Sequence, residues 1–273
     1  MPELPEVETV RRALALKLPG RRIEAVRGRR ARMRRLLDPP ALARSLAGRR
    51  LALPRRRGKY LLLDTEDGGA LLIHLGMSGH LQLVSPGRPV EPHTHLAIRL
   101  DDGRELRLTD PRRFGFAAFL PRGAEAADPS LAGLGPDALD DAIEGWLPPL
   151  LKARRAPLKA LLLDQRLVAG LGNIYATEAL FRAGIRPSRP GNATSSTRLR
   201  RLAGSVRNVL LDALSAGGTT LRDHLSPDGT PGYFQVELDA YGRAGLPCRR
   251  CGALLHTARI AGRSTVWCPS CQR

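Results

Sequence analysis

The chain has 273 residues, enough for two domains with ordinary hydrophobic cores. Its formal net charge is +18 and its pI is about 11.2, which indicates a polyanionic partner, most simply nucleic acid. With only 5 Phe, 4 Tyr and 2 Trp, the sequence argues against a protein that binds single strands mainly by stacking. Contact with the phosphate backbone fits this composition better.

The N-terminus has no basic–apolar–small signal segment, so we do not expect export. Residues 68–87 lack Asp, Glu, Lys and Arg, but they contain five glycines together with His74 and His80. Such a stretch predicts strands and turns rather than a membrane span. We therefore expect a soluble, cytoplasmic protein that works as a monomer and has no membrane partner.

The first 120 residues predict one helix followed by short strands. Residues 5–18 have a helical period, and their apolar face is formed by Val7, Val10, Leu14 and Leu18. Apolar runs beyond residue 22 predict strands, and glycine-containing segments at 67–69 and 101–103 supply turns between them. The expected strands lie at 61–63, 71–73, 96–100, 106–108 and 114–120. This spacing is typical of a β-sandwich, which the first helix would cover.

The composition changes to Pro, Gly, Ala and Ser at 121–136, which predicts a linker. Helical periodicity follows, and a second loop rich in glycine and proline covers 216–233. We therefore expect an α+β multidomain protein. Its parts are a sandwich domain at 2–120, the linker, a helical domain at 137–233 and a cysteine-bearing unit at 234–273. Helices are expected at 137–151, 157–163, 174–183 and 196–215.

The N-terminal segment reads MPELPEVE. If Met1 is removed, Pro2 becomes a secondary amine with the carboxylate of Glu3 beside it. An α-amino group has a pKa of about 7.7–8.0, against about 10.4 for lysine, so much more of it is neutral near pH 7. A neutral amine can attack a sugar or carbonyl carbon and form an iminium. Alternatively, Pro5 and the glutamates only start a helix, and one helix start can serve both purposes.

All four cysteines lie in two CxxC pairs separated by 16 residues, which is the pattern of a structural zinc site. Two disulfides or redox-active pairs are the alternatives, disfavoured by the expected compartment and by the lack of a βαβ setting. Residues 254–267 between the pairs alternate like a hairpin whose tip carries Arg263, and an arginine there suits phosphate contact. The expected ligands are Cys248, Cys251, Cys268 and Cys271.

The chain holds only four lysines, Lys17, Lys59, Lys152 and Lys159. An arginine cannot replace an amine that must lose its proton, so a retained lysine such as Lys59 deserves inspection. The segment at 55–60 that contains it also fits an ordinary solvated basic turn.

Two turn-rich segments, 74–79 and 109–115, place Met77, Arg112 and Phe114 near strand ends. A protein that extrudes a nucleotide needs such side chains to fill the vacated stack. From these segments alone, we favour the simpler reading that Met77 and Phe114 are core residues and Arg112 a surface charge.

Two further segments carry weaker signals. The GLGN segment at 170–173 lies between two predicted helices, where Asn173 could cap the second helix and its amides could receive a phosphate. A plain connection between helices explains it equally well. His93 and His95 have no matching Cys or acidic ligand, so we assign no metal there and only a phosphate contact to His93.

Together these motifs resemble the bacterial formamidopyrimidine-DNA glycosylases, and the matching pieces run the length of the chain. They are 2–8, 74–79, 109–115, 172–175, 217–221, 231–234, 241–243 and the cysteine pairs. The resemblance implies a β-sandwich, a helix–two-turns–helix module and a zinc finger. It also implies an enzyme that binds damaged double-stranded DNA, excises oxidised purines and nicks the strand by β- and δ-elimination. The implied cofactor is one structural zinc ion, with no organic cofactor.

Carried onto this sequence, the resemblance makes Pro2 the nucleophile and Glu3 the proton donor and general acid/base. Lys59 matches the lysine assigned to β-elimination, and Arg263 matches the finger-tip arginine assigned to δ-elimination. Glu6 resembles a second active-site carboxylate.

The resemblance also reverses the core interpretation, because Met77, Arg112 and Phe114 match the residues that fill the void and wedge the duplex. Where the family commonly has a lysine and an aromatic in the lesion loop, this chain has Arg222 and His224, so those contacts are not carried over. The positions that match DNA contacts are His93, Arg112, Arg154, Lys159, Asn173 and Tyr241.

Two alternatives stay open at this point. One is the related endonuclease VIII class, which prefers oxidised pyrimidines; the N-terminal segment and the Arg112–Phe114 pair favour the purine enzyme. The other is a zinc-ribbon protein that binds nucleic acid without chemistry. It explains the net charge and the cysteines, but neither the Pro2–Glu3 start nor Lys59.

Overall fold

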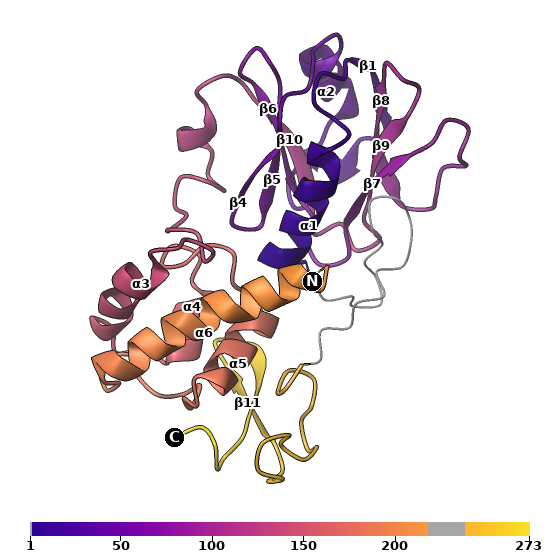
Figure 1. The fold of residues 1–273 in the computed structure, drawn as a ribbon. Helices are drawn as coiled ribbons and strands as arrows, with labels where there is room; N and C mark the ends of the chain where they lie inside the picture. The colour runs from indigo at the N-terminus through magenta and orange to yellow at the C-terminus, as the bar shows by residue number, and fades with distance from the viewer. Residues whose placement is uncertain (1, 218–237) are drawn as a thin grey trace. The chain divides into compact units, whose positions relative to one another are not determined.

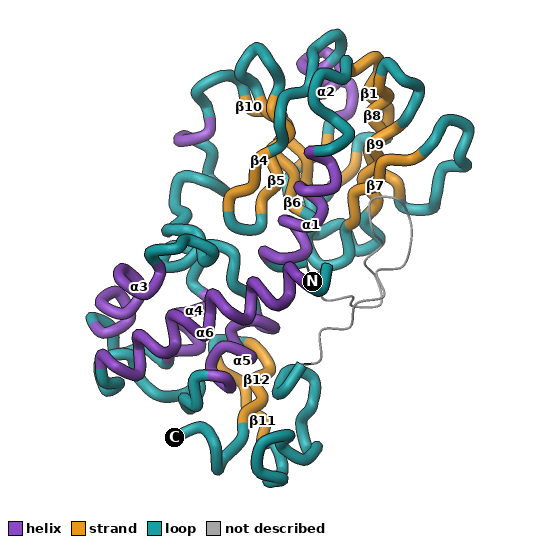
Figure 2. The backbone as a smooth tube through the Cα atoms, in the orientation of Figure 1, coloured by secondary structure: helices purple, strands orange, loops and turns teal. Residues whose placement is uncertain are grey.

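A computed structural model describes residues 2–217 and 238–273, and the chain divides into two compact units (Figure 1). Among the described residues, the N-terminal unit comprises 2–132 with 216–217, and the C-terminal unit comprises 133–215 with 238–273. Figure 2 shows strands and a leading helix in the first unit, and mainly helices with one hairpin in the second. Among the described residues, no helix is both long enough and apolar enough to cross a membrane.

The N-terminal unit is a β-sandwich of two four-stranded antiparallel sheets, as predicted. One sheet has the order β1-β8-β9-β7 and the other β10-β6-β5-β4, with short β2 and β3 pairing separately. The strand bounds are β1 Ile23–Gly28, β2 Ala31–Arg32, β3 Leu36–Leu37, β4 Arg55–Arg57, β5 Tyr60–Asp64, β6 Ala70–His74, β7 His80–Val84, β8 Thr94–Leu100, β9 Glu105–Thr109 and β10 Phe116–Leu120.

The leading helix α1 spans Leu4–Ala15, so it ends earlier than its apolar period predicted. Leu14 is its last core residue, whereas Leu16 is 86% exposed and the chain has already left the helix. The apolar face of α1 joins one core with the inward faces of both sheets. The helix therefore covers the sandwich, and its first turn is fixed by that packing.

Helix α2, Pro39–Leu46, was not predicted. Two prolines at its start obscured the helical pattern, although proline is well tolerated in a first turn, where no intrahelical amide bond is lost. The N-cap Asp38 accepts a hydrogen bond from the Ala41 amide. The predicted linker also has structure: a 3-10 turn at Glu125–Ala127, and Asp128, which pairs with Arg35 of the sandwich.

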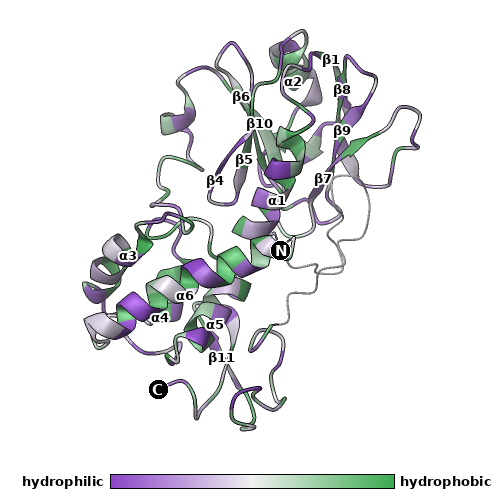
Figure 3. Ribbon diagram, viewed as in Figure 1, coloured by the Kyte–Doolittle hydropathy of each residue, from purple (hydrophilic) through white to green (hydrophobic). Residues whose placement is uncertain are grey.

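The C-terminal unit contains four helices and the hairpin of β11 His256–Ile260 and β12 Arg263–Trp267. Its helices are α3 Ile143–Lys152, α4 Leu158–Leu163, α5 Asn173–Arg182 and α6 Ser196–Ser215. Figure 3 shows hydrophobic and hydrophilic residues alternating along α6, which has the predicted bounds. The predicted start of α3 at residue 137 was wrong, because the side chains of Asp137 and Asp140 accept from amides two residues on and hold turns instead.

Candidate active site and nucleic-acid contacts

The start of α1 is a buried pair of carboxylates next to Pro2. Glu3 is the N-cap and Glu6 the third helical residue, and the two form a reciprocal capping box. The Glu6 Oε2 atom accepts the Glu3 amide at 2.7 Å. Glu3 is 1% exposed and Glu6 3% exposed, so neither carboxylate is a solvated surface charge. The arrangement fixes an acid beside the Pro2 nitrogen, which remains an amide until Met1 is removed.

Lys59 is carried by a tight two-residue hairpin between β4 and β5. Arg57 pairs with Tyr60, and Gly58 takes the positive φ of 56° that such a turn requires. Arg56 anchors this hairpin to α1, donating to Glu8 at 3.1 Å and to the Gly58 carbonyl at 3.0 Å. The predicted catalytic lysine is therefore half-buried on a hairpin held by a side chain of the first helix.

Glu8 is the anchor of this connection. Burial alone would raise the pKa of its carboxyl, but hydrogen bonds from Arg11 and Arg12 and the charge of Arg56 outweigh it and hold the pKa at about 2. Arg11 donates to both carboxylate oxygens, at 2.9 and 2.8 Å. Glu8 was not singled out from the sequence, where it resembles any acid in a first helical turn.

The two segments expected to carry the wedge residues lie together. Phe114 is 47% exposed and Arg112 is also exposed, with its guanidinium 4.9 Å from the Phe114 ring centre. Met77 is half-buried in the turn after β6. The simpler reading of Met77 and Phe114 as core residues was wrong, because an exposed phenylalanine under an arginine is not core packing.

The histidines of the 93–95 segment have separate environments. His93 is exposed and has a left-handed backbone with φ of 64°, just before β8 begins. His95 is buried, and its Nε2 atom lies 2.9 Å from the Asp110 carbonyl. Since that carbonyl only accepts, Nε2 donates. The part of the chain that the structure describes shows no metal-ligating group around either histidine.

In the C-terminal unit, α5 begins at the predicted phosphate-binding segment. Gly172, not Asn173, is the N-cap, and Asn173 is the first helical residue. The Asn173 side chain donates to the Ser264 carbonyl of β12 at 3.0 Å. The first turn of α5 contains no acidic residue. The hairpin thereby holds the start of α5, and no acid from the first turn of α5 itself lies at the positive end of the helix dipole.

Lys159 lies beneath this helix start and is fully buried. Its ammonium donates to the Asn173 carbonyl at 3.1 Å and to the Thr177 hydroxyl. This burial argues against a direct DNA contact by the side chain and instead makes Lys159 a support for the first turn of α5. Arg154, which follows α3, is half-buried and donates to the Leu150 carbonyl at 2.6 Å.

Glu178 joins the segment before the zinc knuckles to α5. Its carboxylate is 2% exposed and accepts the amides of Asp239, Ala240 and Tyr241 at 2.9, 2.9 and 2.7 Å. Burial raises the pKa of this carboxyl despite the three amides. The Tyr241 side chain is half-buried, and its backbone is fixed by this acid.

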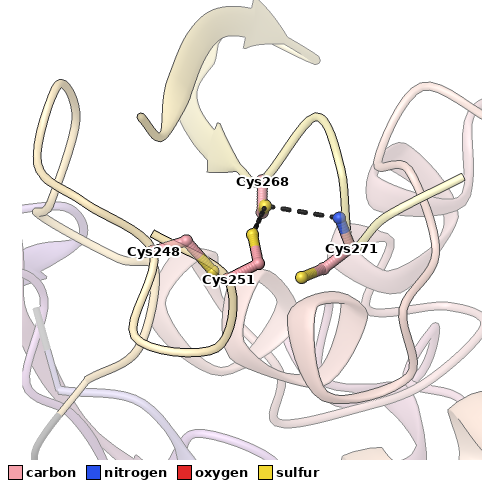
Figure 4. A group of neighbouring side chains, drawn as sticks. All are labelled: Cys248, Cys251, Cys268 and Cys271. Atoms are coloured by element: carbon pink, nitrogen blue, oxygen red, sulfur yellow. Dashed lines mark hydrogen bonds between the residues drawn. The ribbon is translucent and has the colours of Figure 1, made fainter. Parts of the chain in front are cut away.

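The four cysteines converge at the base of the hairpin, with no disulfide between them (Figure 4). Their Sγ atoms all lie within 4.8 Å of one another, and the Cys251 and Cys268 Sγ atoms are 3.4 Å apart. A tetrahedron with Zn–S bonds of about 2.3 Å has sulfurs about 3.8 Å apart, so the donor set fits zinc. The Cys271 amide also points at the Cys268 Sγ atom, at 3.3 Å, as in a metal-binding knuckle.

Arg263 is exposed at the predicted hairpin tip. Ile260 pairs with Arg263, and the two residues between them, Ala261 and Gly262, have φ of 48° and 71°. Positive φ at both central positions is typical of a tight type I′ turn. The segments at 218–221 and 231–234, together with Arg222 and His224, lie outside the described residues.

Sequence reasoning missed three buried acids, Glu8, Asp110 and Glu178, and the buried His74. Asp110 precedes a proline at a strand end, where Asx turns are common, and Glu178 interrupts an otherwise apolar helix face. Those local signals could have drawn attention to both residues. Their distant partners could not have been found, because Ser78 lies 32 residues from Asp110 and the amides held by Glu178 lie 61–63 residues away.

Three family models match the chain. Residues 1–117 match the formamidopyrimidine-DNA glycosylase N-terminal domain, 134–224 its H2TH domain, and 245–273 a zinc finger found in FPG and IleRS. Among curated proteins, the formamidopyrimidine-DNA glycosylase of Stenotrophomonas maltophilia is 53% identical and that of Alkalilimnicola ehrlichii 49%. Each alignment covers 100% of both chains.

Solved structures agree with these matches. The MutM (Fpg) protein of Thermus thermophilus is 44% identical with a TM-score of 0.87, over 99% of this chain and 98% of that one. Lactococcus lactis Fpg in complex with DNA containing an abasic site is 33% identical with a TM-score of 0.90, over 100% of both chains. The chain therefore belongs to the formamidopyrimidine-DNA glycosylase family.

Proposed function

We propose that this protein is a bifunctional DNA glycosylase and AP lyase that removes oxidised purines from duplex DNA. The proposal is supported by identities of about one half over full length to formamidopyrimidine-DNA glycosylases. A MutM structure that is 34% identical to this chain holds DNA containing carbocyclic 8-oxo-G. The observation that carries the chemistry is the buried Glu3–Glu6 capping box beside Pro2.

In the proposed reaction, the free nitrogen of Pro2 bonds to the sugar C1′ of a flipped nucleotide. The glycosidic bond breaks, and the base leaves with the electron pair of that bond and takes up the proton that the Pro2 nitrogen loses. Glu3 then protonates the ring oxygen O4′, which opens the sugar and leaves an iminium between Pro2 and C1′. Its buried position next to the helix start suits an acid that must hold and return a proton at one place.

Strand cleavage follows from the iminium, which makes the C2′ proton acidic. Loss of that proton expels the 3′ phosphate, and a second elimination expels the 5′ phosphate. We assign Lys59 to the first elimination and Arg263 to the second, with Glu6 as the acid that holds the Glu3 backbone. A zinc ion held by the four cysteines would be structural and would fix the hairpin that presents Arg263.

We also assign a role to each part of the chain. Residues 2–120 would carry the chemistry, 121–136 would link, 137–233 would form the DNA-binding module, and 234–273 the zinc finger. His93, Arg112, Arg154, Asn173 and Tyr241 are proposed to contact DNA, while Met77, Arg112 and Phe114 would fill the void left by the flipped base. We expect the enzyme to act as a monomer. Since its substrate would be chromosomal DNA, it would work at the nucleoid in the bacterial cytoplasm.

Borohydride trapping tests the proposal. Sodium borohydride should fix the full-length enzyme covalently to duplex DNA containing 8-oxoguanine opposite cytosine. Pro2→Gly should abolish trapping, because glycine offers a primary amine of altered geometry in place of the ring nitrogen. Pro19→Gly, at an exposed proline beyond α1, is the matched control and should trap like the parent. No trapping by the parent would contradict the proposal, and preferential trapping on thymine glycol would indicate the oxidised-pyrimidine class instead.

A further inference from the structure

Asp110 is a completely buried acid to which the proposed mechanism gives no role. It lies directly after β9, at the start of the loop that carries Arg112 and Phe114. Its Oδ1 atom accepts the Ser78 hydroxyl at 2.7 Å and the Arg112 amide at 3.3 Å. Its Oδ2 atom accepts the Gly115 amide at 2.8 Å. The carboxylate thus joins the 110–115 loop to the 75–79 turn, in which Ser78 follows Met77.

The backbone of Asp110 reaches a third segment. Its amide donates to the His93 carbonyl at 3.1 Å, and its carbonyl accepts from His95 Nε2 at 2.9 Å. His93 therefore owes its position before β8 to the same residue. Every sandwich residue proposed to contact DNA or to enter the stack lies on one of the three segments that Asp110 holds.

The 75–79 turn and the 110–115 loop are also in close backbone contact, and two glycines make this possible. A Cβ atom on Gly76 would lie 2.3 Å from the Gly115 nitrogen, and one on Gly115 would lie 2.6 Å from the His74 carbonyl oxygen. Real Cβ atoms do not approach so closely, so neither position accepts a side chain without moving the backbone. The turn and the loop must therefore shift together if either one shifts.

The buried His74 also holds the 75–79 turn. Its Nδ1 atom accepts the Gly76 amide at 3.0 Å, and its ring stacks on Phe116 with centres 6.0 Å apart. Burial, with the charges of Arg34 and Lys59, lowers the pKa of His74 to about 3. The ring therefore stays neutral at physiological pH and keeps a lone pair for Gly76.

We infer that Asp110 is the positioning residue that makes Met77, Arg112 and Phe114 a single preformed wedge. This inference rests on the proposed function. Opening a duplex and extruding a nucleotide costs free energy, and any ordering of the inserted side chains would add to that cost. Because one buried carboxylate already holds the two segments that carry the three side chains, the wedge enters the duplex with little further ordering of its backbone.

Asp110→Asn is the informative substitution because it preserves size and removes one acceptor. The asparagine amide offers only one oxygen. If it faces Ser78, the Gly115 amide meets an NH₂ group; if it faces Gly115, the Arg112 amide keeps only the Ser78 hydroxyl oxygen, at 3.2 Å. An unsatisfied buried donor typically costs enough to change an equilibrium by about tenfold. Asp128→Asn is the matched control: Asp128 is also a buried acid of the sandwich unit, but it pairs with Arg35.

The experiment compares two substrates with the full-length, zinc-loaded enzyme. For Asp110→Asn, single-turnover excision of 8-oxoguanine from duplex DNA should fall by about tenfold or more. Cleavage of a single strand containing an abasic site needs no wedge and should stay within about twofold, since no stacked duplex must be opened. Asp128→Asn should leave the ratio of the two rates unchanged.

Amide hydrogen exchange gives a readout that does not depend on activity. The Gly115 amide should exchange faster in Asp110→Asn than in the parent, while amides in the core of α1 should not change. Equal loss on both substrates, an unchanged duplex rate, or unchanged exchange at Gly115 would each overturn the inference. Failure of the parent enzyme to act on either substrate would instead overturn the proposed function, and the exchange measurement would still decide whether Asp110 holds the loop.

Discussion

The starts of α1 and α5 are built in opposite ways. At α1, Glu3 and Glu6 satisfy the first amides with the chain's own carboxylates, and the whole device lies within four residues. At α5, the N-cap is Gly172, and the first turn is held from outside by Lys159 and through Asn173 by the hairpin. The α1 start thus carries two acids of its own, whereas the first turn of α5 carries none.

This difference predicts which start depends on distant structure. The capping box of α1 is formed by residues of the helix start itself, whereas the α5 start also depends on a hairpin whose base is closed by four cysteines. A change at α1 should therefore affect the chemistry without affecting binding. A change at the cysteines should affect binding and leave the sandwich folded.

The largest expected effect is that of Glu3→Gln. A glutamine can still accept the capping amide but cannot transfer a proton, so single-turnover excision should fall by roughly 10²–10⁴-fold. Affinity for uncleavable damaged duplex should stay within about threefold, since no phosphate contact is lost. Gel-shift titration beside excision kinetics checks both. An equal loss of affinity and rate would contradict the prediction that a change at the α1 start leaves DNA binding intact.

The next effect concerns the metal. Cys268→Ser removes a buried zinc ligand, so the protein should lose its bound zinc and at least about tenfold in DNA affinity as the hairpin loosens. Metal analysis and gel-shift titration measure the two losses. The circular dichroism of the sandwich should persist, because its core does not include the hairpin. Full DNA binding by a metal-free variant would refute this dependence.

The smallest expected effect is that of Glu8→Gln on the stability of the fold. The folded-state pKa of Glu8 is lowered from 4.5 to about 2, so its stabilisation is present above pH 4.5 and is lost as the pH falls towards 2. Glu8→Gln should cost about 1–3 kcal/mol at pH 7 and almost nothing near pH 2. Urea unfolding across this pH range tests it. A constant difference between parent and variant would show that the carboxylate charge is not what stabilises α1.

Much of the fold could be predicted because its signals are local. Helix α6 follows twenty residues of amphipathic spacing, and the hairpin of β11 and β12 follows the alternation of residues 254–267. The start of α3 and helix α2 were missed because aspartate turns and prolines outweigh periodicity there. These competing interactions involve one or two hydrogen bonds each and leave no periodic pattern.

The candidate site divides in the same way. Pro2, Glu3 and the cysteines stand out in short motifs, so the sequence alone pointed to them. Asp110 did not, because its role exists only once β7, β8 and β9 bring residues 78, 93 and 115 around it. The burial of Lys159 was equally invisible, since a lysine in the first turn of a short helix is usually a surface charge.

The most direct test of the central claim is to map the adduct formed by borohydride trapping. After reduction, proteolysis and mass spectrometry should find Met1 absent and the deoxyribose remnant on the nitrogen of Pro2. An adduct on Lys59, or an active enzyme whose Pro2 still carries Met1, would contradict the claim that the N-terminal proline is the nucleophile.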